Sequence, residues 1–100
     1  MVIDIYEHDG QLVTTSHSLA QNLGVKHGEV VRAIWALCDA DDGDPLIRKE
    51  FRAVPYDAYL KEYELTKRGV CAVLSTFRGD YPKELMRSYL RHFDHLLGVN

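Results

Sequence analysis

Basic residues at the start of one segment have the types and the spacing to contact nucleic acid. In the stretch TTSHSLAQNLGVKHGEVVRAI, residues 14–34, the pair Lys26-His27 is followed by Arg32, one helical turn after Glu29. A lysine neutralises phosphate as a point charge, whereas the guanidinium fork of arginine binds phosphate or the edge of guanine. If a helix begins at this pair, its dipole favours an anion at the same end. The spacing predicts a DNA contact in which Arg32 reads bases.

Other polar residues could widen this contact surface. Hydroxyls at Thr15 and Ser16 can donate to the DNA backbone. Lys67 and Arg68 fall in the first turn of a later expected helix, where cations oppose the helix dipole, and a phosphate contact would explain them. Glu29 would repel phosphate but can accept a hydrogen bond from cytosine. The candidate DNA-binding residues are Thr15, Ser16, Lys26, His27, Gly28, Glu29, Arg32, Lys67 and Arg68.

A purely structural interpretation of the same residues stays open. Two short helices joined by a glycine turn are also an ordinary way to close a core. His27 lies nearer the expected buried stripe than the exposed one, as a packing or helix-start histidine would. Lys67 and Arg68 can equally be solvated surface residues.

Catalytic and metal-binding arrangements are not indicated. His92 and His95 have i, i+3 spacing, but no third metal ligand is placed beside them. Ser16 lacks the glycine elbow or other activating context of a nucleophile. Cys38 and Cys71 are expected to be small buried hydrophobic residues on helices. We therefore expect no enzyme activity, no metal and no cofactor.

The elements that must position the candidate residues begin with a hairpin and a helix-turn-helix. Apolar and polar residues alternate through 2–6 and resume at 12–14 after an Asp-Gly pair, which is typical of a hairpin. A helix-turn-helix is predicted over about 16–38, with Ser16 as the cap of its first helix. Gly24 permits the left-handed residue that the turn needs. The predicted buried stripe of its second helix is Val30, Val31, Ile34, Leu37 and Cys38. On the far side of that helix we expect Gly28, Glu29, Arg32 and Ala36, with Trp35 at the margin.

The second half of the chain predicts another hairpin and two helices. Residues 39–45 (DADDGDP) form an acidic loop, and a hairpin over about 51–65 follows, with Pro55 favouring an edge strand. Two C-terminal helices are expected over about 66–97, the first capped by Thr66 and ended by Gly79. The apolar residues expected along one line of helix 66–79 are Val70, Val73, Leu74 and Phe77.

Length and composition predict one small α+β domain over residues 1–100, winged-helix-like, with a helix-turn-helix, two β-hairpins and two C-terminal helices. The net charge of −3 argues against general affinity for polyanions, so a phosphate contact must use a local patch. Residues 61–100 carry seven Lys or Arg against five acids. The chain has neither a signal-like N-terminus nor an apolar run of about 20 residues, so we expect a cytoplasmic protein with no membrane partner.

The broad apolar face of the last helix suggests assembly. If neighbouring helices leave part of it uncovered, it would pair with a second subunit, and a two-fold dimer sets two reading helices about 34 Å apart. A core helix of a monomer is the alternative. The predicted dimer interface consists of Leu85, Met86, Tyr89, Leu90, Phe93 and Leu97.

Three blocks of this sequence also resemble the phage regulatory proteins of the Rha family, across about residues 12–97. They are TTS…LA…G.KH..VVRAI within 14–34, YELTKRGV at 63–70 and FRGDYPKELMRSYLRHF at 77–93. The resemblance implies phage or prophage gene regulation through DNA binding. The family often has Asn or Asp beside the position of Glu29, and a small polar residue where this chain has Arg78.

We therefore expect a phage or prophage transcriptional regulator, located in the cytoplasm of a bacterial host, that binds double-stranded DNA as a homodimer. The alternative is a protein-interaction module, such as an antirepressor that docks on a phage or host regulator. That module would use the apolar face of the last helix or the acidic loop at 39–44.

Overall fold

The computed structural model describes residues 2–39, 45–55 and 61–98. Most of the predicted acidic loop and the tip of the second hairpin, residues 40–44 and 56–60, lie outside the described residues. The elements in chain order are β1 (Tyr6–His8), β2 (Gln11–Thr15), α1 (Ser16–Leu23), α2 (His27–Asp39), a 3₁₀-helix η1 (Pro45–Glu50), β3 (Phe51–Pro55), β4 (Lys61–Leu65), α3 (Lys67–Leu74) and α4 (Asp80–Leu97).

The two hairpins join into one four-stranded antiparallel sheet of order β1-β2-β4-β3. Hairpin β1–β2 pairs Tyr6 with Val13, and hairpin β3–β4 pairs Phe51 with Leu65. Strand β2 then pairs with β4, with Thr14 opposite Leu65. The second predicted hairpin is confirmed, and so is the Asp9-Gly10 turn of the first, but the first strand is Tyr6–His8 and not residues 2–6. The union of the hairpins into a single sheet is an additional finding.

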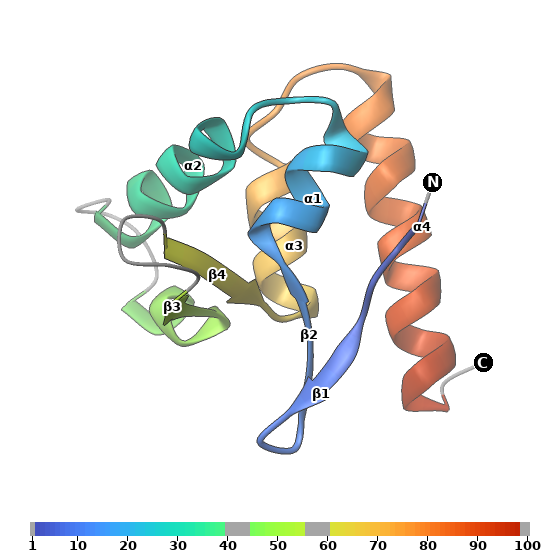
Figure 1. The fold of residues 1–100 in the computed structure, drawn as a ribbon. Helices are drawn as coiled ribbons and strands as arrows, with labels where there is room; N and C mark the ends of the chain where they lie inside the picture. Colours follow the sequence, from blue (N-terminus) through green and yellow to red (C-terminus); the bar gives the residue numbers. More distant parts are fainter. Residues whose placement is uncertain (1, 40–44, 56–60, 99–100) are drawn as a thin grey trace.

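The helices enclose a core beside this sheet, so the small α+β class is confirmed. Helices α1 and α3 lie at the centre, with α2 and α4 on opposite sides of them (Figure 1). None of the helices within the described ranges combines the length and the apolar character that crossing a bilayer requires. The residues with the least exposure in this core are Leu19, Val30, Ile34, Leu65, Val70, Val73, Leu74, Leu85, Tyr89 and Phe93.

The helix-turn-helix begins one residue earlier than the sequence suggested. Thr15 is the cap of α1, because its hydroxyl accepts from the backbone N–H of Ser18 at 3.1 Å. The prediction that Ser16 caps this helix is wrong, since Ser16 is the first helical residue and is fully buried. Gly24 ends α1 in the left-handed conformation with φ 78°, as predicted.

Helix α3 starts as predicted but ends early. The hydroxyl of Thr66 accepts from the N–H of Gly69 at 3.2 Å and caps the helix. The last helical residue is Leu74, so Phe77 lies in the connection to α4, half-buried against the core, and not on the helix. Gly79, with φ 111°, is the cap residue of α4.

Gly69 lies where the backbone of another element approaches α3. A Cβ atom at this position would stand 2.7 Å from the carbonyl oxygen of Glu50 and 3.1 Å from Cε1 of Phe51. The same carbonyl of Glu50 accepts from the N–H of Thr66 at 3.1 Å, so it cannot turn away freely. Only glycine allows this contact between α3 and the start of β3.

The predicted dimer interface is wrong for half of its residues. Leu85, Tyr89 and Phe93 are at most 1% exposed, because they pack against the chain's own helices and cannot meet a second subunit. Of the other three, Met86 and Leu90 are half-buried. Leu97 is 55% exposed and is the one predicted interface residue that is largely open to solvent.

Both cysteines are free thiols on helices, as predicted. Each is only half-buried, whereas full burial was expected. Burial raises the pKa of the Cys38 thiol and that of the Cys71 thiol, which keeps both protonated near neutral pH. They fill space in the structure and have no feature of a reactive thiol.

Candidate nucleic-acid interface

The outer face of α2 presents the central candidate residue to solvent. Val30 and Ile34 face the core, and residues two positions apart on a helix point about 200° apart. Arg32 stands two positions from each of them and is therefore exposed on the opposite side. Lys26, just before the helix, is also exposed.

The guanidinium of Arg32 lies over the first turn of α2. Its Nη2 is 3.8 Å from where a Cβ of Gly28 would be, an ordinary contact distance, so the guanidinium lies beside Gly28. Among the described residues, neither Arg32 nor Lys26 forms an ion pair. These two cations and the helix dipole act together at one end of α2.

Glu29 has a structural task at the same helix end. Its Oε2 accepts from the backbone N–H of Lys26 at 3.0 Å, the reciprocal half of a capping box. The carboxylate satisfies a backbone donor that would otherwise be unpaired. Its negative charge partly offsets the two cations, so Glu29 supports the helix and does not strengthen an anion site.

Ser16 and His27 connect α1, α2 and β4. The Ser16 hydroxyl oxygen accepts from the backbone N–H of Tyr63 at 2.9 Å and lies 2.8 Å from Nε2 of His27. Since Ser16 is fully buried, its assignment as a DNA contact is wrong. His27 is half-buried with one ring nitrogen occupied, which supports the packing interpretation that the sequence left open.

A second histidine stacks on the first. The rings of His17 and His27 have centroids 3.6 Å apart and planes 12° apart. Nδ1 of His17 is 3.2 Å from Oε1 of Glu62 on β4. Burial lowers the pKa of His27, and the positive charge of a protonated His17 lowers it further, against a smaller opposite effect of Glu62.

This lowered pKa predicts a loss of stability in mild acid. The unfolded imidazole has the ordinary pKa of about 6.5, so below it the unfolded chain binds more protons than the folded one. The contribution of His27 is complete above about pH 6.5 and is lost as the pH falls from there toward the lower folded value. Urea titrations at about pH 7.5 and pH 5.5 should show a smaller decrease in unfolding free energy for His27→Gln than for wild type. Equal decreases for the two proteins would refute this role of His27.

Trp35 is a surface residue that the sequence reasoning placed only at the margin of α2. It is 51% exposed, and its Nε1 donates to the hydroxyl of Tyr63 on β4 at 2.8 Å. Trp35 follows Arg32 by three positions, so both lie on the same side of the helix. The spacing of three positions from Arg32 was the sequence signal that would have identified Trp35 as a surface residue.

The basic pair on α3 is not part of the α2 surface. Nζ of Lys67 pairs with Oδ1 of Asp94 on α4 at 2.5 Å, so this cation is neutralised within the chain and is removed from the candidate surface. Arg68 is exposed, but it lies at the amino end of α3, away from the amino end of α2 (Figure 1). The hydroxyl of Thr66 donates to the Glu50 carboxylate, so an acidic side chain also lies at this end of α3.

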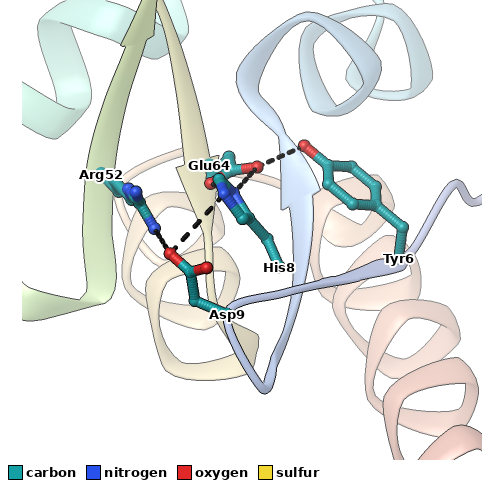
Figure 2. A network of polar contacts seen from close by, with 5 residues as sticks. All are labelled: Tyr6, His8, Asp9, Arg52 and Glu64. Atoms are coloured by element: carbon teal, nitrogen blue, oxygen red, sulfur yellow. Dashed lines mark hydrogen bonds and ion pairs between the residues drawn. The ribbon is translucent and has the colours of Figure 1, made fainter.

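A polar network links the strands of the two hairpins. The carboxylate of Glu64, only 4% exposed, accepts from the hydroxyl of Tyr6 and from Nδ1 of His8, each at 2.6 Å (Figure 2). Nη1 of Arg52 on β3 pairs with Oδ2 of Asp9 at 2.7 Å. Burial and the neighbouring Glu64 raise the pKa of Tyr6 well above its usual range, so its hydroxyl stays a donor.

This network is structural in character. It links β1 to β4 across β2, and the turn after β1 to β3, so the two hairpins are cross-braced. Within the described residues, no buried side-chain nitrogen or oxygen lacks a hydrogen-bond partner. Nor do these residues contain a group of three or more His, Cys, Asp or Glu that could hold a metal ion.

No protein-family model, curated protein or solved structure matches this chain. Geometry alone therefore indicates which of the candidate residues share a surface. Of the nine predicted DNA-binding residues, Lys26, Gly28 and Arg32 gather at one exposed helix end, with Glu29 among them. The α2 surface, as we call it, consists of Lys26, Gly28, Arg32 and Trp35.

Proposed function

We propose that this chain is a transcriptional regulator of phage or prophage origin that binds double-stranded DNA through the α2 surface. The observation that carries the proposal is Arg32, an exposed arginine opposite the buried stripe of α2 and without an ion pair among the described residues. A second helix of a helix-turn-helix reads the major groove with residues near its amino end. Lys26 directly precedes α2 and Arg32 is its sixth residue, so both lie toward the amino end of the helix.

A winged-helix-like arrangement is part of the proposal. Hairpin β3–β4 would serve as the wing, since Tyr63 of β4 is hydrogen-bonded to Trp35 of α2. The buried Ser16 hydroxyl also binds the backbone of Tyr63, which fixes the hairpin relative to α1 and α2. A wing held in this way would place its backbone beside the DNA strand that flanks α2. The resemblance of three sequence blocks to the Rha family favours the same function.

Arg32→Gln and Lys26→Gln are expected to weaken DNA binding in different ways. Loss of an arginine that reads guanine costs about 1–3 kcal/mol of discrimination, so Arg32→Gln should remove the preference for guanine at the contacted position in sequences selected from random DNA. Lys26→Gln should weaken binding to all sequences alike and lower the salt slope by about one unit. Trp35 is the sole tryptophan of the chain, so its fluorescence reports binding directly.

Arg78→Gln is the matched control, because Arg78 is also an exposed arginine but lies outside the α2 surface. Its loss removes the same charge and should leave sequence preference unchanged. If Arg32→Gln and Lys26→Gln titrate selected DNA like the wild type, the α2 surface does not bind DNA.

Binding to a protein is the second candidate function. The exposed ring of Trp35 and the net charge of −3 favour it, because tryptophan is enriched at protein interfaces and acidic chains are repelled by DNA. In this case the chain would act as an antirepressor on a phage or host regulator. Passage through heparin without retention at moderate salt would favour this candidate, whereas retention would favour DNA.

A further inference from the structure

Helix α4 carries a row of cations that the α2 surface does not use. Lys83, Arg87 and Arg91 recur at every fourth position, with a rise of about 6 Å per step along the helix. All three are exposed. Each lies two positions from a residue of the buried stripe, so the row faces away from the core, on the opposite side of α4 from Leu85 and Tyr89. We call Lys83, Arg87 and Arg91 the α4 row.

The α4 row is flanked by acidic residues but is not paired with them. Within the described part of the chain, none of its three side chains forms an ion pair. Asp94, the nearest acid toward the carboxyl end, is engaged by Lys67. Asp80 and Glu84 lie toward the amino end of the helix, where they suit the dipole, and Glu84 borders the row.

The row also faces away from the α2 surface. Helices α2 and α4 lie on opposite sides of α1 and α3 (Figure 1), and each directs its buried stripe toward this centre. The outer sides of α2 and α4 therefore point in different directions. A short, straight duplex bound to one of them does not reach the other.

Two features favour nucleic acid as the ligand of the α4 row. An amphipathic helix binds a membrane by inserting its apolar stripe, but Leu85, Tyr89 and Phe93 are already packed inside the protein. A straight, regularly spaced line of cations instead matches a regularly spaced line of phosphates. Arginines at two of the three positions add the geometry that suits phosphate oxygens.

We infer that the α4 row is a second, separate binding surface for the phosphate backbone of duplex DNA. It contacts backbone and not bases, so its binding is independent of sequence and strongly dependent on salt. The inference goes beyond the proposed function of α2 and stands on different residues.

The test compares four proteins by fluorescence anisotropy with a labelled mixed-sequence duplex of about 12 base pairs. They are the wild type, an α2 variant with Lys26→Gln and Arg32→Gln, an α4 variant with Lys83→Gln, Arg87→Gln and Arg91→Gln, and a protein with all five changes. In the α2 variant, we expect the α4 changes to weaken the remaining binding at least tenfold and to lower the salt slope by about two to three units.

A matched variant with Arg48→Gln, Lys49→Gln and Arg78→Gln controls for net charge. It removes three exposed cations that lie outside both the α2 surface and the α4 row, so the net charge changes by the same amount as with the α4 changes. In the α2 variant we expect these control changes to leave most of the remaining binding intact. If they weaken binding as much as the α4 changes do, the loss reflects overall charge and the inference is refuted.

The remaining outcomes separate this inference from the proposed function. If the α4 changes leave DNA binding unaltered in both the wild type and the α2 variant, the α4 row is not a DNA surface. That conclusion would not depend on whether the α2 surface binds DNA. If the α2 changes have no effect but the α4 changes abolish binding, the inference holds and the function proposed for α2 fails.

Discussion

Replacing Gly69 with alanine is expected to lower the free energy of unfolding by about 2–3 kcal/mol. The new Cβ would stand 2.7 Å from the carbonyl oxygen of Glu50, a distance that requires the backbone to move. That carbonyl is also the acceptor for the N–H of Thr66, so the movement would weaken the start of α3 as well. Urea unfolding followed by circular dichroism measures the change.

Gly28→Ala is the matched control, since it makes the same substitution in the first turn of a helix. Here the new Cβ would meet only Nη2 of Arg32, at the ordinary contact distance of 3.8 Å. Alanine is favoured over glycine in a helix, so this variant should gain up to about 0.5–1 kcal/mol. A Gly69→Ala protein as stable as Gly28→Ala would show that the close approach of Glu50 to α3 is absent.

Phe93→Ala is expected to lower the free energy of unfolding by about 3–4 kcal/mol. The ring is 1% exposed and packs in the cluster that joins α4 to α1 and α3. Its removal takes apolar surface out of the core and leaves a cavity that the neighbours fill only in part. The unfolding midpoint should fall by the same amount at every protein concentration, because Phe93 belongs to the interior of one chain.

Leu97→Ala separates a core role of α4 from an assembly role. Leu97 is 55% exposed, so its loss should change the stability of a monomer by less than about 0.5 kcal/mol. If instead Leu97→Ala destabilises the protein in a concentration-dependent manner, α4 forms a subunit interface at this end. A small effect of Phe93→Ala, comparable with that of Leu97→Ala, would contradict the observed core.

Secondary structure was predictable wherever local chemistry decides it. The hairpins, the turn at Gly24, the Thr66 cap and the order of the helices follow from periodicity and from residues with special backbone preferences. Boundaries were less certain, because Thr15 and Ser16 can both cap a helix. Ser16 is buried where the backbone of Tyr63 donates to its hydroxyl, and this contact is visible only in the structure.

Contacts between elements distant in the sequence were not predictable. Glu64 reads as a solvated strand residue, yet it is buried because Tyr6 and His8 from another hairpin supply its hydrogen bonds. Lys67 reads as an unpaired cation until Asp94 is placed beside it. The apolar face of α4 could equally have met a second subunit, and only the positions of α1 and α3 show that its centre is covered.

The candidate site was predictable in its centre and not at its borders. Arg32 was placed on the exposed side of its helix by periodicity alone, because Val30 and Ile34 define the opposite side. His27 could not be assigned, since its partners Ser16 and His17 come from α1. Trp35 was not chosen as a candidate, because an aromatic residue at the margin of an apolar stripe ordinarily belongs to the core.

The place of β2 inside the sheet has a consequence for biosynthesis. Its second neighbour, β4, begins only at Lys61, so β2 leaves the ribosome well before the strand that completes its hydrogen bonding. Until then, one side of Gln11–Thr15 presents open backbone donors and acceptors, the kind of template on which nascent chains associate. Closing the β2–β4 pair joins residues about 50 positions apart, a slow step that governs how long a newly made chain is exposed to aggregation.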